Sequence, residues 1–588
     1  MDYYNFYAGT AFDLWKDMGA HIDESGTTFT VYAPAAKSVS LIGEFNHWQP
    51  EAMERTGDGR FYTLHVTNAG HLQMYKYRIT GADGKVVDHC DPFAFYNELR
   101  PGTASRIYNM HRYQFYDETW MKKRKKNIDK PLNIYEMHMG SWKKKEEDNP
   151  TGWYNYREVA DQLIPYLLDN GYNAVEIMPL SEYPDDASWG YQATGFYAIT
   201  SRYGEPDDLR YFVDMCHRNN IAVILDFITV HFAINYDGLA NFDGTPLYEY
   251  PNSAVQNSEW GSCNFMHSRP EVRCYLQSAV DFLLEAYHFD GIRFDAVGNL
   301  IYWQGNESRG VNTNAIDFAK KMNEGLHIRH PDVILIAEDS SAYPGVTSTD
   351  GLAFDYKWDL GWMNDTLRYF SLPFAERTKN YHTLTFRSAY AQNEKYILPL
   401  SHDENVHGKK TIIEKMYGDY ETRFQQARML YMYMYALPGK KLDFMGNEFA
   451  MMREWDEKRS QDFNLLSYPI HDAFLHFRKD LHHLYLTSSS LYERDYREDG
   501  FQWVTADNAK DCIYAFRRFS SHETTVFIMN CSDKPHSYFW SSTAGIKLLM
   551  DSSDTKYGGT NTKENTRSIN GKVHIILPPL TARIYLEY

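Results

Sequence analysis

The 588-residue chain has little cysteine and no long apolar run. Its 6 cysteines are scattered and include no Cys-x-x-Cys pair, so they predict reduced, packed thiols rather than a zinc site or a disulfide framework. The longest apolar run, residues 429–437, is too short to span a bilayer. The first residues lack the charged start and apolar core of a secretory signal, and we therefore expect a cytoplasmic protein without membrane association.

Basic charge is also scarce in this chain. Lys and Arg number 60 against 78 Asp and Glu, which gives a formal net charge of −18. This balance disfavours nucleic acid and acidic membrane surfaces as partners. The basic run at residues 122–126 is an exception, and we interpret it as a solvated linker because no matching basic face occurs elsewhere in the sequence.

Aromatic residues, in contrast, are abundant. They make up 16% of the chain and include 47 tyrosines and 13 tryptophans. Core packing could absorb many of these rings. Rings also stack on the apolar faces of sugars, so composition leaves a carbohydrate partner open without deciding it.

Both ends of the chain have the pattern of all-β domains. Short strands at 27–34, 38–45, 61–66 and 74–79 alternate with Asn-, Asp- and Gly-containing turns, which predicts a β-sandwich. Short strands return from about residue 490 and predict a second sandwich. We therefore expect three domains, at 1–117, 118–489 and 490–588.

The middle of the chain alternates strands with helices. Strands are predicted at 132–139, 174–180, 222–228, 291–297, 333–339, 354–360, 396–403 and 441–449. Helical patterns lie between many of them; in 206–220, for example, Leu209, Phe212, Val213 and Cys216 share one face. Eight strands with intervening helices predict an α/β fold, a (β/α)8 barrel with long insertions.

Polar and charged residues follow several of these apolar strands. They are Tyr191, Asp226, His231, Arg293, Asp295, Glu338, His402 and Asp403. A single carboxylate in such a position would more often be a helix cap or a member of an ion pair. Because the carboxyl ends of barrel strands share one face, several of them together predict an active site there.

Two carboxylates in one pocket suit the cleavage of a glycosidic bond. One attacks the anomeric carbon and the other protonates the leaving oxygen. Period-two alternation places Arg293 and Asp295 on the same side of their strand, and a neighbouring guanidinium favours an ionised carboxylate. Asp295 therefore fits the nucleophile and Glu338 the proton donor.

Four motifs in this order resemble those of the α-amylase superfamily, glycoside hydrolase family 13. They read DFITVH (226–231), GIRFDAV (291–297), AEDSS (337–341) and LSHDENVHGKK (400–410). Further stretches resemble the family's 1,4-α-glucan branching enzymes, among them YEMHMGSW (135–142), SWGYQATGFYA (188–198) and FMGNEFAMMREW (444–455). The resemblance covers nearly the whole chain and implies cleavage of α-1,4 links and transfer of the chain to a glucose 6-hydroxyl.

The resemblance also implies a role for each residue. Asp295 would be the nucleophile, Glu338 the general acid/base, and Asp403 a third carboxylate that binds hydroxyls of the distorted sugar. The substrate-binding positions would be Tyr191, Asp226, His231, Arg293 and His402. Taken alone, each histidine would more often be a satisfied structural residue.

The N-terminal sandwich resembles a family 48 carbohydrate-binding module, through GEFNHW (43–48), YKYRI (75–79) and DPFAFYNELRPGTAS (91–105). Trp48 and Lys76 match positions that contact glucan in some such modules. A structural role for Trp48, packing the module against the barrel, is an equal alternative.

The sequence departs from the superfamily pattern without losing a reacting group. Residues 227–229, Asp339 and Asn405 differ from the usual residues, and the loop after residue 298 is short. A related α-glucan hydrolase and a catalytically silent glucan-binding scaffold remain as rivals, although the retained carboxylates argue against the scaffold. We expect α-1,4-glucan chains as partners and neither cofactor nor metal. The oligomeric state is open, with a monomer favoured.

Overall fold

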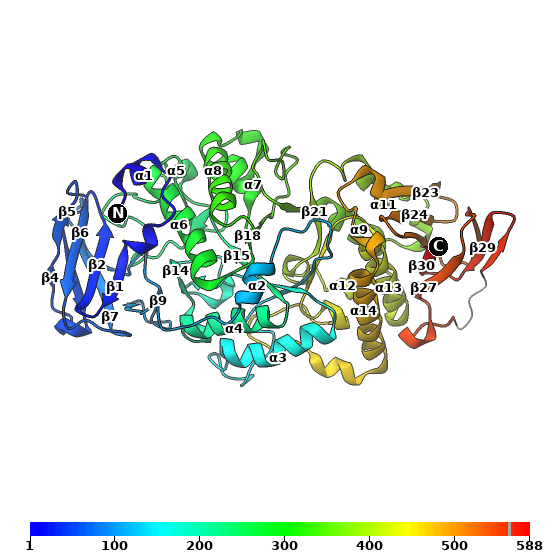
Figure 1. Cartoon of the computed structure of the whole chain (residues 1–588), viewed down its shortest axis with the longest axis horizontal. Coiled ribbons are helices and arrows are strands. Elements are labelled where there is room, and N and C mark those ends of the chain that lie inside the picture. Colours follow the sequence, from blue (N-terminus) through cyan, green and yellow to red (C-terminus); the bar gives the residue numbers. More distant parts are fainter. Residues whose placement is uncertain (562–565) are drawn as a thin grey trace. The chain divides into compact units, whose positions relative to one another are not determined.

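The computed structural model describes residues 1–561 and 566–588 (Figure 1). By their internal contacts these residues divide into two compact units. The first comprises Met1–Lys125, His138–Ile164 and Glu176–Phe354, and the second Lys126–Met137, Pro165–Val175 and Asp355–Tyr588. The domain boundaries expected after residues 117 and 489 stay a prediction.

Eight strands form a closed parallel barrel. Their order is β11 (Asn133–Met137), β12 (Ala174–Ile177), β15 (Ala222–Phe227), β18 (Gly291–Phe294), β19 (Ile334–Ala337), β20 (Tyr356–Trp358), β21 (Tyr396–Leu400) and β22 (Lys440–Phe444). Each overlaps a strand predicted from the sequence, in the same order, so the barrel prediction is confirmed. Nearly every residue of these strands is buried, as expected for parallel strands covered on both faces.

Helices alternate with the barrel strands. The long ones are α3 (Tyr156–Asp169), α4 (Pro206–Arg218), α6 (Pro270–Tyr287), α8 (Thr313–Arg329), α9 (Leu360–Ser371), α13 (Tyr420–Ala436) and α14 (Pro469–Thr487). Shorter helices are α5 (Ser253–Gln256), α7 (Val297–Ile301), α10 (Phe374–Arg377), α11 (His382–Thr385) and α12 (Ile412–Lys415), while α1 (Tyr3–Ala8) and α2 (Glu118–Lys123) precede the barrel. In α4 the proline stands in the first turn, and the predicted apolar face is fully buried.

The N-terminal module consists of two antiparallel sheets, drawn in blue in Figure 1. One contains β1 (Gly19–Asp23), β2 (Gly26–Tyr32), β6 (Phe61–Val66) and β5 (Glu54–Thr56). The other contains β4 (Glu51–Ala52), β3 (Ser38–Gly43), β7 (Met74–Thr80), β10 (Ser105–Arg106) and β9 (Tyr96–Asn97), with β8 (Val86–His89) paired to β7. Alternate residues of β7, namely Tyr75, Tyr77 and Ile79, are buried, which is the pattern of a strand with one face on a core.

The described residues of the C-terminal part also form two antiparallel sheets, coloured orange to red in Figure 1. The larger contains β23 (Phe501–Asn508), β24 (Ile513–Phe519), β25 (Thr524–Asn530), β30 (Thr581–Glu587) and β27 (Ile546–Asp551). The smaller contains β26 (His536–Ser541), β29 (Lys572–Leu577) and β28 (Arg567–Ile569). Side chains from both sheets, such as Val526, Trp540 and Ile575, share one apolar cluster. The predicted all-β ends are therefore confirmed.

The structure also describes the state of the cysteines and the length and hydropathy of the helices. All 6 cysteines lie within the described residues, where each is buried and free, as predicted for packed thiols. Across residues 1–561 and 566–588, no helix is both long enough and apolar enough to cross a membrane.

Candidate functional site

Arg293 and two carboxylates occupy the carboxyl ends of β15 and β18, neighbouring strands in which Asp226 lies opposite Arg293. Nη1 of Arg293 donates to both oxygens of Asp226, at 2.8 and 2.7 Å, and to Oδ1 of Asp295 at 2.9 Å. The side chains of Arg293 and Asp226 are each 1% exposed. The contact expected between Arg293 and Asp295 is therefore present. The guanidinium makes two hydrogen bonds to Asp226 and one to Asp295.

The charges in this cluster support one another. Burial by itself would lower the pKa of Arg293, yet the carboxylates, Asp226 foremost, raise that pKa well above its ordinary value. A guanidinium that stays charged favours the ionised form of every carboxyl beside it. The arrangement can therefore hold a nucleophilic carboxylate ready at neutral pH.

Glu338 follows β19 and faces the same guanidinium. Its Oε2 accepts a hydrogen bond of 2.7 Å from the backbone N–H of Ala296 and lies 3.9 Å from Nη2 of Arg293. Ala296 adopts a left-handed conformation, with φ of 50°, at the turn between β18 and α7. The side chains of Asp295 and Glu338 are 16% and 18% exposed, so both carboxyls can be reached by a ligand.

Tyr191 extends this network from an adjacent loop. It lies before β14 (Gly195–Ile199), and its hydroxyl donates to Oδ2 of Asp226 at 2.5 Å. Asp226 therefore receives hydrogen bonds from both Tyr191 and Arg293. This double contact holds the tyrosine ring beside the carboxylate cluster.

His231 begins β16 (His231–Phe232), which pairs with β17 (Cys263–Asn264). Burial lowers the pKa of His231 to about 4, so the imidazole is neutral near pH 7. Its Nδ1 lies 2.9 Å from the hydroxyl of Ser262. The ring of Trp260, 44% exposed, lies 5.0 Å from the imidazole, centroid to centroid.

His402 and Asp403 lie in the second unit, in the turn after β21. Nδ1 of His402 is 2.5 Å from Oε1 of Glu136, and the backbone N–H of His402 donates to Oε2 of Glu136 at 2.9 Å. Glu136 lies within β11 and is fully buried. The side chain of Asp403 is 50% exposed and lies 3.6 Å from Nε2 of His402.

The chain has close relatives among curated proteins. It is 44% identical over 546 residues to 1,4-alpha-glucan branching enzyme GlgB of Geobacillus stearothermophilus, a match covering 90% of this chain and 85% of that protein. The GlgB enzyme of Bacillus subtilis (strain 168) is 41% identical over 579 residues, with 95% and 91% covered. The chain belongs to the GlgB family of 1,4-alpha-glucan branching enzymes.

Family descriptions and solved structures agree with the architecture of this GlgB-family chain. Residues 17–94 match carbohydrate-binding module 48 (isoamylase N-terminal domain), 143–242 the α-amylase catalytic domain, and 503–586 the α-amylase C-terminal all-β domain. A putative α-amylase from Salmonella typhimurium superposes with a TM-score of 0.74 at 18% identity, covering 97% of this chain and all of the other. A pullulanase from Anoxybacillus sp. LM18-11, complexed with maltotetraose, gives 0.73 at 16% identity, with 99% and 89% covered. At such identities these structures show the fold alone.

Sequence reasoning missed two residues around the histidines of this family member. Glu136 lies in the motif YEMHMGSW (135–142). A carboxylate inside an apolar strand is costly to bury without a partner, so its position could have indicated a buried contact. Trp260 lies in an insertion whose local pattern carried no comparable signal. Both are brought to the histidines only by folding.

The remaining predicted positions lie in the N-terminal module. Trp48 follows a short turn after β3 with 37% of its surface exposed, and the amine of Lys76, on β7, donates to the hydroxyl of Thr103. Their role in glucan contact stays a prediction. Among the residues that the structure describes, no three His, Cys, Asp or Glu side chains are grouped so as to hold a metal ion.

Proposed function

We propose that this chain is a 1,4-α-glucan branching enzyme, which cleaves an α-1,4 link and transfers the released chain to a glucose 6-hydroxyl. The observation that carries the proposal is the pair of accessible carboxyls, Asp295 and Glu338, beside one buried guanidinium. Relatives named as branching enzymes over nearly the full chain support the same reaction.

In the first half of the proposed reaction, Asp295 attacks the anomeric carbon and Glu338 donates its proton to the departing O4. The bond between Asp295 and the sugar retains the donor chain, while the shortened glucan leaves with its new hydroxyl. Arg293 keeps Asp295 ionised through the 2.9 Å contact.

In the second half, Glu338 accepts the proton of an incoming 6-hydroxyl, whose oxygen displaces Asp295 from the anomeric carbon. Two inversions retain the α configuration, and the product is an α-1,6 branch. Water competes for the same step, so transfer requires an acceptor held close and aligned. Without such an acceptor the same residues would perform hydrolysis.

The other predicted residues would hold the sugar. Nδ1 of His231 contacts Ser262, so Nε2 of this neutral imidazole is left for a sugar hydroxyl. The ring of Tyr191 offers an apolar surface for the glucose. His402, oriented by Glu136, and the exposed Asp403 would bind further hydroxyls.

We further propose α-1,4-glucans such as glycogen or amylose-like chains as the substrate, and the cytoplasm as the place of action. The carboxylates supply the nucleophile and both proton transfers, so the proposed mechanism requires no cofactor and no metal.

Incubation with amylose tests the proposal. Branching lowers the iodine absorbance and produces α-1,6 linkages, detected by NMR, with little gain in reducing ends. A gain in reducing ends that parallels the loss of iodine colour, without α-1,6 linkages, would identify a hydrolase. No change in either signal would identify a silent binding scaffold.

A further inference from the structure

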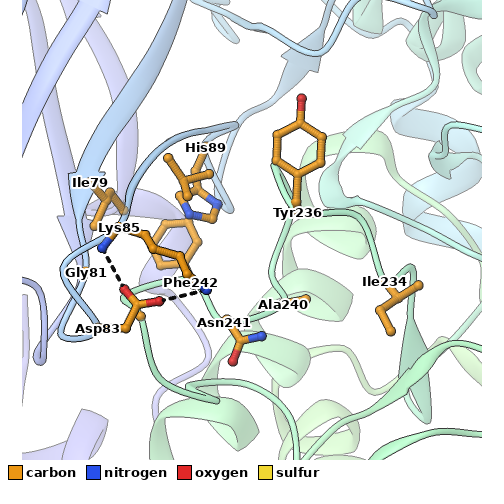
Figure 2. A pocket seen from close by; sticks show the side chains of 12 residues that line it. Ile79, Gly81, Asp83, Lys85, His89, Ile234, Tyr236, Ala240, Asn241 and Phe242 are labelled. Carbon is orange, nitrogen blue, oxygen red and sulfur yellow. Dashed lines mark hydrogen bonds and ion pairs between the residues drawn. The ribbon is translucent and has the colours of Figure 1, made fainter.

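A cavity of about 360 Å³ lies within the first unit, between the β7–β8 hairpin and the segment that follows β16 (Figure 2). Asp83 and Lys85 line it from the hairpin, and Ile234, Tyr236 and Asn241 line it from the opposite segment. Its volume is in the range of cavities that bury most of a small ligand.

Two hydrogen bonds hold the two walls of the cavity together. The N–H of Ala82 donates to the carbonyl of Asp243 at 2.9 Å. Nδ1 of His89 donates to the carbonyl of Gly238, also at 2.9 Å. Because these bonds join the hairpin to the opposite segment, the two walls are held together before any ligand binds.

The cavity presents apolar surface to solvent. Tyr236 is 78% exposed and Ile234 is 58% exposed, and both residues line the cavity. Figure 2 shows them on one side, across from Lys85 and Asp83. Exposed apolar groups gathered at a concave site are typical of a binding surface.

The charges at the cavity cancel. Nζ of Lys85 lies 3.4 Å from Oδ2 of Asp83, so the two neutralise each other. Burial lowers the pKa of His89, which keeps that imidazole neutral near pH 7. A phosphate or a nucleotide would find no surplus positive charge here, whereas a neutral ligand rich in hydroxyls would meet a ring, an amide and an ion pair that can accept and donate hydrogen bonds.

We propose that this cavity binds a segment of α-1,4-glucan, with a sugar face against the ring of Tyr236 and hydroxyls bonded to the amide of Asn241. The ligand class rests on the proposed function. The segment with Tyr236 follows His231 after only a few residues, so one stretch of chain serves both the predicted sugar-binding histidine and the cavity. An anchored glucan would raise the local concentration of chains for transfer.

The test measures glucan affinity by retardation in native gels that contain amylopectin. The parent is Asp295→Ala, which prevents remodelling of the polysaccharide. Added to it, Tyr236→Ala should raise the dissociation constant about fivefold or more, the size of loss seen when an anchoring aromatic is truncated. Asn241→Gly is a second cavity variant; Asn241 has φ of 49°, so glycine removes the amide without backbone strain.

Tyr4→Ala is the matched control, because Tyr4 is 81% exposed and does not line the cavity. It should leave the affinity unchanged. In the active enzyme, Tyr236→Ala should raise KM for amylose with kcat within about twofold, as expected for loss of uniform binding. If the native enzyme branches amylose but both cavity variants bind like their parent, the cavity site is wrong and the proposed function stands; if it does not branch amylose at all, the proposed function fails by itself.

Discussion

Replacing Arg293 by Met removes the charge at the centre of the carboxylate cluster while keeping an unbranched side chain. Asp226, 1% exposed, then loses the guanidinium that donates to both of its carboxylate oxygens. Removing one partner of a buried ion pair costs about 3–5 kcal/mol. Asp295 loses less, because its side chain is 16% exposed and water can replace part of the interaction. We therefore expect a clear fall in the unfolding temperature, measured by calorimetry.

The same substitution should change the pH dependence of the reaction. Nη1 of Arg293 lies 2.9 Å from Oδ1 of Asp295, and an opposite charge at such range favours the ionised form of a carboxyl group. The acidic limb of kcat/KM should therefore move to higher pH in Arg293→Met. Initial rates of iodine-colour loss on amylose, taken from acid to neutral pH, give this limb.

A double variant separates the two effects. Arg293→Met with Asp226→Asn removes both buried charges and leaves an amide that can still accept the hydrogen bond of Tyr191. It should recover most of the lost stability, while the acidic limb stays displaced. The reasoning is refuted if the single variant keeps the native limb, or if the double variant is no more stable than the single one.

Three further outcomes are expected. Asp295→Ala should lower the branching rate by several orders of magnitude with little change in the unfolding temperature, and near-normal branching would contradict its assignment as the nucleophile. His217 lies 2.7 Å from Asp117 and 2.9 Å from Asp290; burial alone would lower its pKa, but the carboxylates raise it from 6.5 to about 9. Its stabilisation is therefore complete below pH 6.5 and lost as the pH rises through about 9, so His217→Gln should flatten that alkaline fall in unfolding temperature, and an unchanged fall would count against the network. Trp260→Ala should raise KM for amylose severalfold with kcat nearly unchanged, whereas an unaltered KM would show that the ring does not contact substrate.

Much of the fold could be predicted because local patterns carry it. A parallel barrel strand is covered on both faces, so apolar residues predominate in most of the eight strands, and a run overlapping each strand was visible in the sequence. Helix α4 was equally predictable, because a proline marks its first turn and its buried residues recur at helical spacing. The contact between Arg293 and Asp295 was predictable for the same reason: the two residues lie on the same side of one strand.

Other contacts of the site were decided only by the tertiary structure. Arg293 bonds Asp226 across 67 residues of sequence, and His402 meets Glu136 across 266. Such contacts depend on which strands are neighbours in the closed barrel and on their register. Local periodicity contains neither, because the same apolar run can pair with several others. By itself the sequence determined which residues would lie at the strand ends. The closure of the barrel decided which of these residues contact one another.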